Sequence, residues 1–192
     1  MHIIEEVLKK GKEVIVLVPE ISLTPQMVNI FKSRFKNSIA ILHSALSDGE
    51  KYDEWNRIEN GDAKIVIGAR SAVFAPLNNI GIIIVDEEHS TTYKQENHPR
   101  YNAKDVAILR GKYNNCPVLF GSATPSLEVY ARAQKGVYKL LILDKRAGRG
   151  KLPNVSVVDM KIEIKKGNFV LSRELIDKIN DRLIKKEQII LL

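Results

Sequence analysis

The stretch Gly-Ile-Ile-Ile-Val-Asp-Glu-Glu-His at residues 81–89 decides how this chain folds. Its first five residues form an apolar run, which is typical of a strand that helices cover on both faces. The three carboxylates that follow cannot lie in an apolar core unless water, cations or hydrogen-bond donors compensate them. The stretch therefore predicts a buried strand whose carboxyl end opens onto an acidic edge.

Four other runs of β-branched and aliphatic residues resemble this strand, and stretches with helical spacing separate them. Such a succession is what a parallel sheet with helices on both faces requires. We therefore expect an α/β fold, and in open sheets of this kind ligands bind at the carboxyl ends of the strands. The further strands are expected at residues 13–18, 38–42, 63–67 and 116–120.

Capping residues occur where the expected helices begin. Thr24-Pro25 is an N-cap followed by proline at the first helical position, and Thr124-Pro125 repeats this pattern. Ser47 and Glu50 have the spacing of a capping box. We expect these signals to begin helices over residues 25–35, 47–61 and 126–135.

Composition excludes several classes of protein. With 192 residues, of which 44% are hydrophobic, the chain has room for one packed core. No apolar run approaches the roughly 18 to 20 residues that a membrane helix needs, and the chain does not begin with a secretory signal, so we expect a cytoplasmic protein without membrane contact. A single cysteine, Cys116, and four scattered histidines exclude a disulfide framework and a zinc site.

The charge is unevenly distributed along the chain. Residues 1–131 carry 15 basic and 16 acidic side chains, whereas residues 132–192 carry 15 and 7. A basic end either faces a polyanion or forms a solvated helix surface, and charge alone leaves both interpretations open.

Three segments are expected along the chain, because residues 144–154 are basic, contain glycines and show no periodicity. This stretch would link a first domain over residues 1–143 to the beginning of a second domain over residues 155–192. In the second domain we expect strands at residues 155–159 and 188–192 and a helix at 172–186.

Chemistry is expected at two of the strand ends. In an acidic cluster after a strand, one carboxylate can hold Mg²⁺ while the next orients and deprotonates a water that attacks a γ-phosphate. The turn at residues 121–126 follows another strand, and its hydroxyl groups could reach both the acidic edge and a polynucleotide backbone. The simpler alternatives are an acidic loop after a core strand and a plain helix cap.

Asp-Glu-Glu-His at residues 86–89 and Gly-Ser-Ala-Thr at residues 121–124 resemble motifs II and III of the superfamily 2 helicases and translocases. The chain as a whole resembles one branch of that superfamily, the PriA family of primosomal replication-restart helicases. Segments similar to the motifs Ia and Ib of this family, and other stretches typical of it, lie at residues 17–26, 68–76, 42–50, 93–101 and 171–175.

This resemblance implies a RecA-like lobe of a P-loop NTPase, with ATP and Mg²⁺ as cofactors. Asp86 would coordinate Mg²⁺ through water, Glu87 would be the general base for ATP hydrolysis, and His89 would complete the nucleotide-binding set. Ser122 and Thr124, together with His89, would couple the nucleotide state to DNA. The DNA contacts that the resemblance implies are Thr24, Gln26, Arg70, Ser71, Tyr93, Lys94, Arg100 and Tyr101.

Two interpretations apply to Tyr93 and Tyr101. Bases can stack on aromatic rings while neighbouring cations neutralise phosphate, which favours a contact with single-stranded DNA. The alternative is that both rings are packing residues of an ordered loop.

The chain also departs from the family pattern. It contains no Gly-x-x-x-x-Gly-Lys-Ser/Thr motif, and residues 1–8 resemble the later part of the helix that follows the P-loop. We therefore expect a first lobe truncated before its P-loop, lacking the P-loop strand and followed by the start of a second lobe. Such a chain should not hydrolyse ATP by itself. The zinc-binding insertion and the arginine finger of the family are expected downstream.

These patterns predict a fragment of an ATP-dependent 3′–5′ DNA helicase of replication restart, which acts on single-stranded and forked DNA with primosome proteins. Two alternatives stay open. One is another superfamily 2 DNA translocase, against which the segments similar to motifs Ia and Ib argue. The other is a stand-alone, non-catalytic module that binds DNA or protein, for which weak, salt-sensitive binding of single strands without nucleotide dependence would speak.

Overall fold

The computed structural model describes residues 1–144 and 153–191. The chain divides into two compact units, Met1–Leu141 and Ile142–Leu192. Most of the expected linker at residues 144–154 lies outside the described residues. Within the described part of the chain, no helix is both long and apolar enough to cross a membrane.

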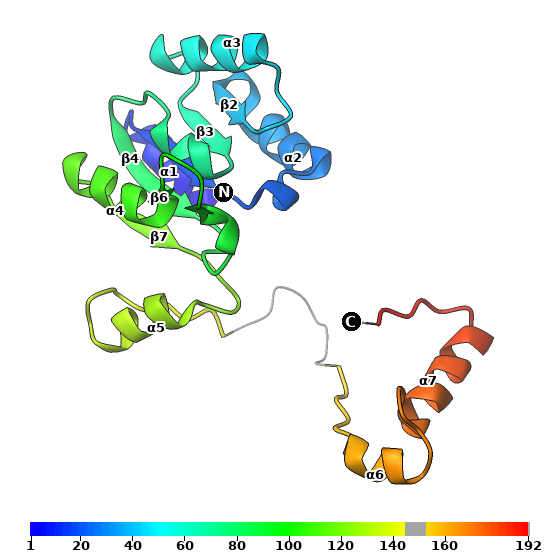
Figure 1. The fold of residues 1–192 in the computed structure, drawn as a ribbon. Helices are drawn as coiled ribbons and strands as arrows, with labels where there is room; N and C mark the ends of the chain where they lie inside the picture. The colour runs from blue at the N-terminus through cyan, green and yellow to red at the C-terminus, as the bar shows by residue number, and fades with distance from the viewer. Residues whose placement is uncertain (145–152, 192) are drawn as a thin grey trace. The chain divides into compact units, whose positions relative to one another are not determined.

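The first unit is built on a five-stranded sheet (Figure 1), whose central strand is β1. Every strand pair in this sheet is parallel, with β1 between β3 and β4 and with β7 beside β4. The strands, in their spatial order, are β2 (Ile39–Leu42), β3 (Ile65–Gly68), β1 (Glu13–Leu17), β4 (Ile80–Val85) and β7 (Val118–Phe120). The five expected strands and the α/β class are therefore confirmed, with bounds that differ from the expected ones by one or two residues at either end.

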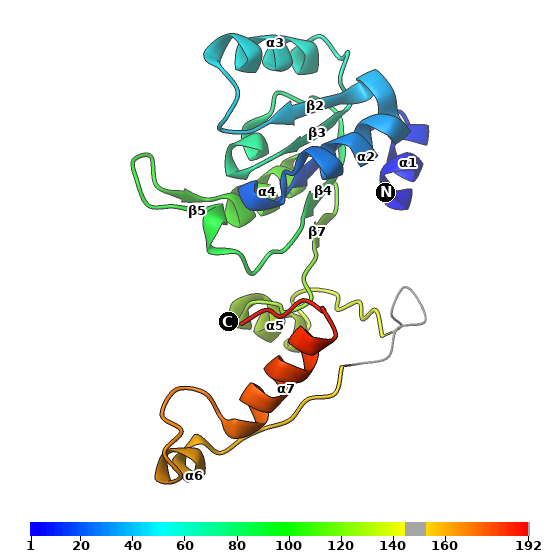
Figure 2. The ribbon, with the colours of Figure 1, turned by 90° about the vertical axis from the view of Figure 1, so that its right-hand side faces the viewer.

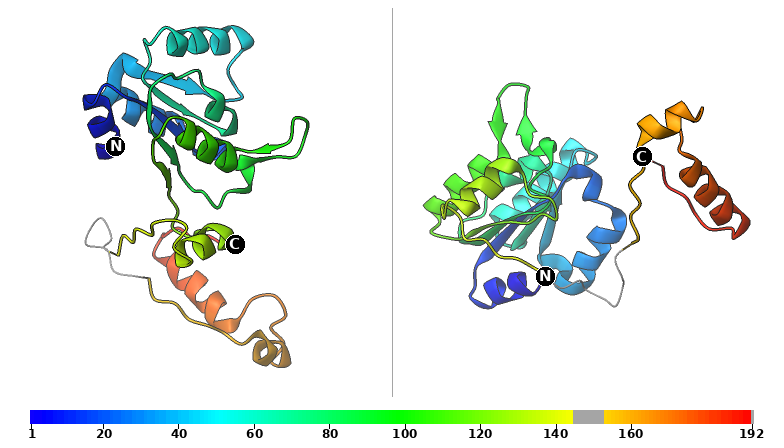
Figure 3. Two further views of the ribbon diagram at one scale, coloured as in Figure 1. Left: turned by 90° about the vertical axis from the view of Figure 1, so that its left-hand side faces the viewer. Right: turned by 90° about the horizontal axis from the view of Figure 1, so that it is seen from below.

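Helices cover both faces of the sheet, because successive strand residues point to opposite sides. In β1, Val14 and Val16 face one core cluster and Ile15 and Leu17 face the other. Figure 3 shows α1 and α2 on one side and α4 on the other. The four helices packed around the sheet are α1 (His2–Lys9), α2 (Pro25–Phe35), α3 (Asp48–Glu59) and α4 (Ala103–Tyr113).

Two of the three expected helix caps are confirmed. The Thr24 hydroxyl accepts a hydrogen bond from the amide of Met27 at 3.2 Å at the start of α2. At the start of α3, Ser47 and Glu50 form the reciprocal pair of a capping box.

The third expected cap, at Thr124-Pro125, is wrong. The N-cap of α5 (Leu127–Gln134) is Ser126, two residues further on. The physical reason is tertiary: the amide and the hydroxyl of Ser126 both donate to the buried carboxylate of Glu88, and this contact decides where the helix begins.

An antiparallel hairpin, which the sequence did not indicate, lies between β4 and α4. It consists of β5 (Lys94–Gln95) and β6 (Tyr101–Asn102), with Lys94 opposite Asn102. Figure 2 shows that the hairpin stands out from the body of the first unit. A short 3₁₀ helix at Thr91–Tyr93 leads into β5, and another at Arg70–Phe74 lies between β3 and β4.

The second unit contains α6 (Met160–Lys165) and α7 (Arg173–Ile184). The Glu163 carboxylate ties them together, since it accepts from the amide of Arg173 at 2.8 Å and from the side chain of Asn168 at 2.9 Å. The expected helix is confirmed, with Ser172 as its N-cap. The expected strands at residues 155–159 and 188–192 are wrong for all residues that the structure describes there, because no neighbouring strand pairs with their backbone groups.

We predict that Gly68→Ala destabilises the first unit. A methyl group at Gly68 would lie 2.6 Å from the β-carbon of Ala72 and would also meet the carbonyl oxygen of Leu42, so backbone must move. Overpacking of this kind costs about 1–3 kcal/mol of unfolding free energy. Gly49→Ala in α3 is the matched control, since nothing lies within 4 Å of its added methyl group. Urea unfolding of both variants tests this, and equal midpoints would contradict it.

Candidate functional site

The acidic strand end and the hydroxyl turn lie side by side at the carboxyl edge of the sheet. Asp86 follows β4, and its amide donates to the carbonyl of Leu17 at 2.9 Å. Gly121 follows β7, and its amide donates to the carbonyl of Val85 at 2.9 Å. A β-carbon at Gly121 would lie 3.4 Å from Oδ1 of Asp86. Glycine therefore leaves space directly beside an exposed carboxylate.

Glu87 has an unusual backbone conformation. Its φ is +45°, in the left-handed region that residues with a β-carbon seldom adopt. Its amide donates to Oδ1 of Asp86 at 3.0 Å. The Glu87 carboxylate is half-exposed and lies 3.5 Å from Nδ1 of His89. Glu87 thus presents a solvent-accessible carboxylate on a strained backbone, a combination that is concentrated at functional sites.

A hydrogen bond joins the two sequence segments that resemble motifs II and III. Nδ1 of His89 lies 2.7 Å from the hydroxyl oxygen of Ser122. The same hydroxyl oxygen accepts from the amide of Thr124 at 3.0 Å, which orders the turn. The structure therefore brings His89, Ser122 and Thr124 together in one cluster.

Glu88 is a site residue that the sequence reasoning did not single out. Its side chain is only 1% exposed, and its carboxylate lies 3.1 Å from Nζ of Lys104. It also accepts from the Ser126 amide at 2.6 Å and from the Ser126 hydroxyl at 2.9 Å. Burial alone would raise the pKa of Glu88, but the contacts from Ser126 and Lys104 outweigh it and lower the pKa. The only feature of the sequence that could have indicated this role is that Glu88 is the third consecutive carboxylate after a buried strand.

The burial of Tyr93 contradicts the expectation that its ring contacts DNA. The ring is 1% exposed, and the hydroxyl donates to the carbonyl of Leu17 at 3.1 Å and to that of Asp86. Burial, together with the nearby carboxylates of residues 86–88, raises the pKa of the phenol far above its ordinary value. A base cannot stack on a ring that the core encloses, so the packing interpretation holds for Tyr93.

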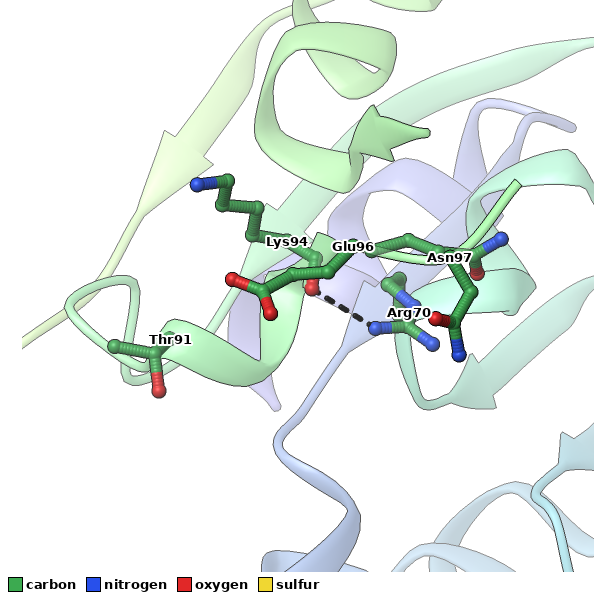
Figure 4. A pocket seen from close by; sticks show the side chains of 6 residues that line it. Arg70, Thr91, Lys94, Glu96 and Asn97 are labelled. Atoms are coloured by element: carbon green, nitrogen blue, oxygen red, sulfur yellow. Dashed lines mark hydrogen bonds between the residues drawn. The ribbon is translucent and has the colours of Figure 1, made fainter. Parts of the chain in front are cut away.

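Arg70 and Lys94 border a polar hollow of about 610 Å³ at the base of the hairpin (Figure 4). Nη1 of Arg70 donates to the carbonyl oxygens of Lys94 at 3.0 Å and Thr92 at 3.3 Å. The guanidinium carbon also lies 5.9 Å from the centre of the Tyr101 ring, whose edge meets Phe74 at 5.0 Å between centroids. Arg70 therefore already binds the hairpin, and Tyr101 is half-buried against it.

Thr24 and Gln26 border a second hollow, which they share with Asp86 and Gly121 and which apolar side chains of α1 and α2 line. The expected DNA contacts are thus divided between two places on the first unit. Ser71 and Arg100 are exposed, and Nε of Arg100 donates to the carbonyl of Glu96 within the hairpin loop.

The geometry agrees with the result of comparison with known families. Residues 1–133 match the DEAD/DEAH box helicase family. The chain belongs to this family. In a DEAD/DEAH box helicase the four-residue box gives the family its name, and here Asp-Glu-Glu-His occupies residues 86–89 at the end of β4.

Curated relatives of this helicase chain carry the name replication restart protein PriA, so the expected resemblance is confirmed. The relative from Bacillus subtilis (strain 168) is 58% identical over 189 residues, which are 98% of this chain and 24% of the relative. The Haemophilus influenzae relative is 46% identical over 192 residues, or 100% of this chain and 26% of the relative. The chain therefore spans about a quarter of the length of these relatives.

We predict that Tyr93→Phe destabilises the chain, because the Tyr93 hydroxyl is a buried donor and not part of an exposed stacking ring. Removing the hydroxyl takes one donor from two carbonyl groups, at a cost of about 1–3 kcal/mol of unfolding free energy. Tyr113→Phe is the matched control, because the Tyr113 side chain is 88% exposed at the end of α4. Equal urea midpoints for the two variants would show that the Tyr93 hydroxyl is not held in this way.

Proposed function

We propose that this chain is part of an ATP-dependent 3′–5′ DNA helicase of replication restart, which assembles the primosome at single-stranded and forked DNA. The observation that carries the proposal is the hydrogen bond between His89 and Ser122 beside Asp86 and Glu87. It connects the acidic end of β4 to the turn after β7. A change of structure at one strand end would therefore be transmitted to the other.

The donor set at the acidic end fits Mg²⁺ with ATP. Mg²⁺ keeps several of its waters and takes phosphate oxygens, so a site needs only one or two protein carboxylates. Asp86 is exposed at the end of β4 and would hold the ion through water. Among the described residues no group of three or more His, Cys, Asp or Glu side chains could hold a metal.

Glu87 would accept the proton of the water that attacks the γ-phosphate. Its carboxylate is half-exposed and so reachable from solvent. His89 lies beside both this carboxylate and Ser122. It would therefore transmit the state of the nucleotide to the turn that holds Thr124.

DNA would bind along the same edge of the sheet. Lys94 and Arg100 are exposed cations of the hairpin and would neutralise phosphate, while Tyr101 would offer the accessible part of its ring to a base. Arg70 would act at the base of the hairpin, where it binds two carbonyl groups. The remaining contacts that we propose are Thr24, Gln26 and Ser71.

The 192 residues by themselves would not hydrolyse ATP, because they contain no Gly-x-x-x-x-Gly-Lys-Ser/Thr motif to hold the triphosphate. Phosphoryl transfer depends almost entirely on positioning and on charge stabilisation, and both need that loop. A zinc site would belong to other parts of the helicase.

We predict that the purified chain shows no DNA-stimulated ATP hydrolysis. The same residues should support it when they replace the matching 189 residues of the Bacillus subtilis relative, whose own turnover is measured alongside. In that chimera Glu87→Gln should reduce turnover by about 100-fold or more, the usual size of a missing general base. If the isolated chain hydrolyses ATP and Glu87→Gln abolishes this activity, a Gly-x-x-x-x-Gly-Lys-Ser/Thr loop is not needed and the prediction is refuted.

We further predict that the hairpin cations contribute to binding of single-stranded DNA. Arg100→Ala should weaken binding of an oligothymidine in fluorescence anisotropy. It should also make the slope of log affinity against log salt shallower by about 0.7, the value for one neutralised phosphate of a single strand. Lys64→Ala is the matched control, since Lys64 is exposed at the opposite edge of the sheet, before β3. Binding by the isolated chain that no nucleotide affects, combined with an inactive chimera, would instead favour the stand-alone module.

A further inference from the structure

We propose that Glu88 is a positioning residue that keeps the backbone of Glu87 in its left-handed conformation. The inference rests on the proposed function, because Glu87 matters only if its carboxylate takes part in ATP hydrolysis. It goes further by assigning a role to the third carboxylate of the box, which is buried away from the exposed edge.

Both oxygens of the Glu88 carboxylate are held. Oε1 accepts from the amide of Ser126, and Oε2 accepts from the hydroxyl of Ser126 and from Nζ of Lys104. Nζ of Lys104 donates in addition to the backbone carbonyl of Glu88 at 3.1 Å. One lysine therefore binds the side chain and the main chain of the same residue, which restrains both.

The residues on both sides of Glu87 are fixed to different elements. After it, the amide of Glu88 donates to the carbonyl of Gly121 at 3.0 Å. Before it, the amide of Asp86 donates to the carbonyl of Leu17, and the hydroxyl of Tyr93 donates to the carbonyl of Asp86. The backbone of Glu87 thus spans two anchored neighbours.

This anchoring accounts for the conformation of Glu87. The left-handed region is unfavourable for a residue with a β-carbon, and such a conformation persists only where the surroundings impose it. Among the described residues other than glycine, Asn115 and Lys186 also have positive φ, but both follow helix ends, where the left-handed conformation is common, and Lys36 at the end of α2 combines φ +52° with ψ −127°. Glu87 instead lies in the turn after β4, where the amide of Ser90 donates to its carbonyl at 2.8 Å, and the contacts of Asp86 and Glu88 anchor the backbone on both sides of it.

Stability alone is a weak reason for such a network. A buried lysine–carboxylate pair loses in desolvation much of what it gains in attraction, so a packed apolar pair would serve a core as well. A buried ion pair does fix the positions of its residues, because each charged group finds few other hydrogen-bond partners in the core. Here the fixed geometry belongs to the residue next to the proposed general base, where misplacement by about 1 Å can cost two orders of magnitude in rate.

The first measurement is hydrogen exchange of the 192-residue chain, followed by mass spectrometry. Glu88→Gln and Lys104→Met should each speed exchange in peptides that cover residues 86–90 and 121–126 by about tenfold, as expected from removing a charge-assisted hydrogen bond. Peptides of β1 and β3 should be unchanged, which shows that the variants fold. Glu163→Gln removes the buried carboxylate of the second unit and is the matched control.

The second measurement is DNA-stimulated ATP turnover of the chimera with the Bacillus subtilis relative. Glu88→Gln and Lys104→Met should lower kcat by about tenfold or more while the KM for ATP changes little, since the positioning acts on the reacting state and not on nucleotide binding. Lys104→Arg should restore part of the turnover, because it keeps a charged donor. A merely structural role would not separate kcat from KM in this way.

Unchanged exchange at residues 86–90 in Glu88→Gln overturns the inference, and so does faster exchange with normal kcat. If the chimera with Glu88 intact lacks DNA-stimulated turnover while the native relative has it, the proposed function fails and the catalytic role of Glu88 fails with it. The exchange result then still decides separately whether Glu88 holds the loop.

Discussion

All strand pairs of the five-stranded sheet are parallel, and the carboxyl ends of β1, β4 and β7 therefore meet at one edge. At this edge, one backbone hydrogen bond joins Asp86 to Leu17 and another joins Gly121 to Val85. They hold together the loop that begins at Asp86 and the loop that begins at Gly121, 35 residues later in the sequence. The strands can be buried because helices cover both faces of the sheet, and the apolar side chains of the strands pack into two core clusters, one on each face. Each functional contact described above depends on this alignment of strand ends.

Three consecutive carboxylates at the end of β4 have three different environments. Asp86 is exposed beside the space that Gly121 leaves, Glu87 is half-exposed next to His89, and Glu88 is buried against Lys104 and Ser126. Environment therefore separates residues of identical or similar chemistry into different roles. Exposed oxygens can meet a hydrated cation, whereas a buried carboxylate with three donors can only hold its surroundings in place.

The segment similar to motif Ib and the hairpin after β4 form one structural region. Arg70 binds the carbonyl groups of Thr92 and Lys94 and lies against Tyr101, which in turn meets Phe74. The hairpin also reaches the acidic edge, because Tyr93, directly before β5, donates to the carbonyl of Asp86. One hydrogen bond thus connects the segment before the hairpin to the backbone next to the proposed general base.

The sequence by itself determined the five strands of the parallel sheet, the α/β class, two of the three helix caps and the residues at the acidic edge, since these follow from apolar runs and from local capping chemistry. It could not separate Tyr93 from Tyr101, because the burial of a ring depends on what packs over it. For the same reason it missed the roles of Glu88 and Lys104 and misplaced the N-cap of α5, where Ser126 contacts a residue 38 positions away. Local patterns determine which elements form, whereas only the tertiary structure decides which side chains meet, because such contacts depend on the packing of distant segments.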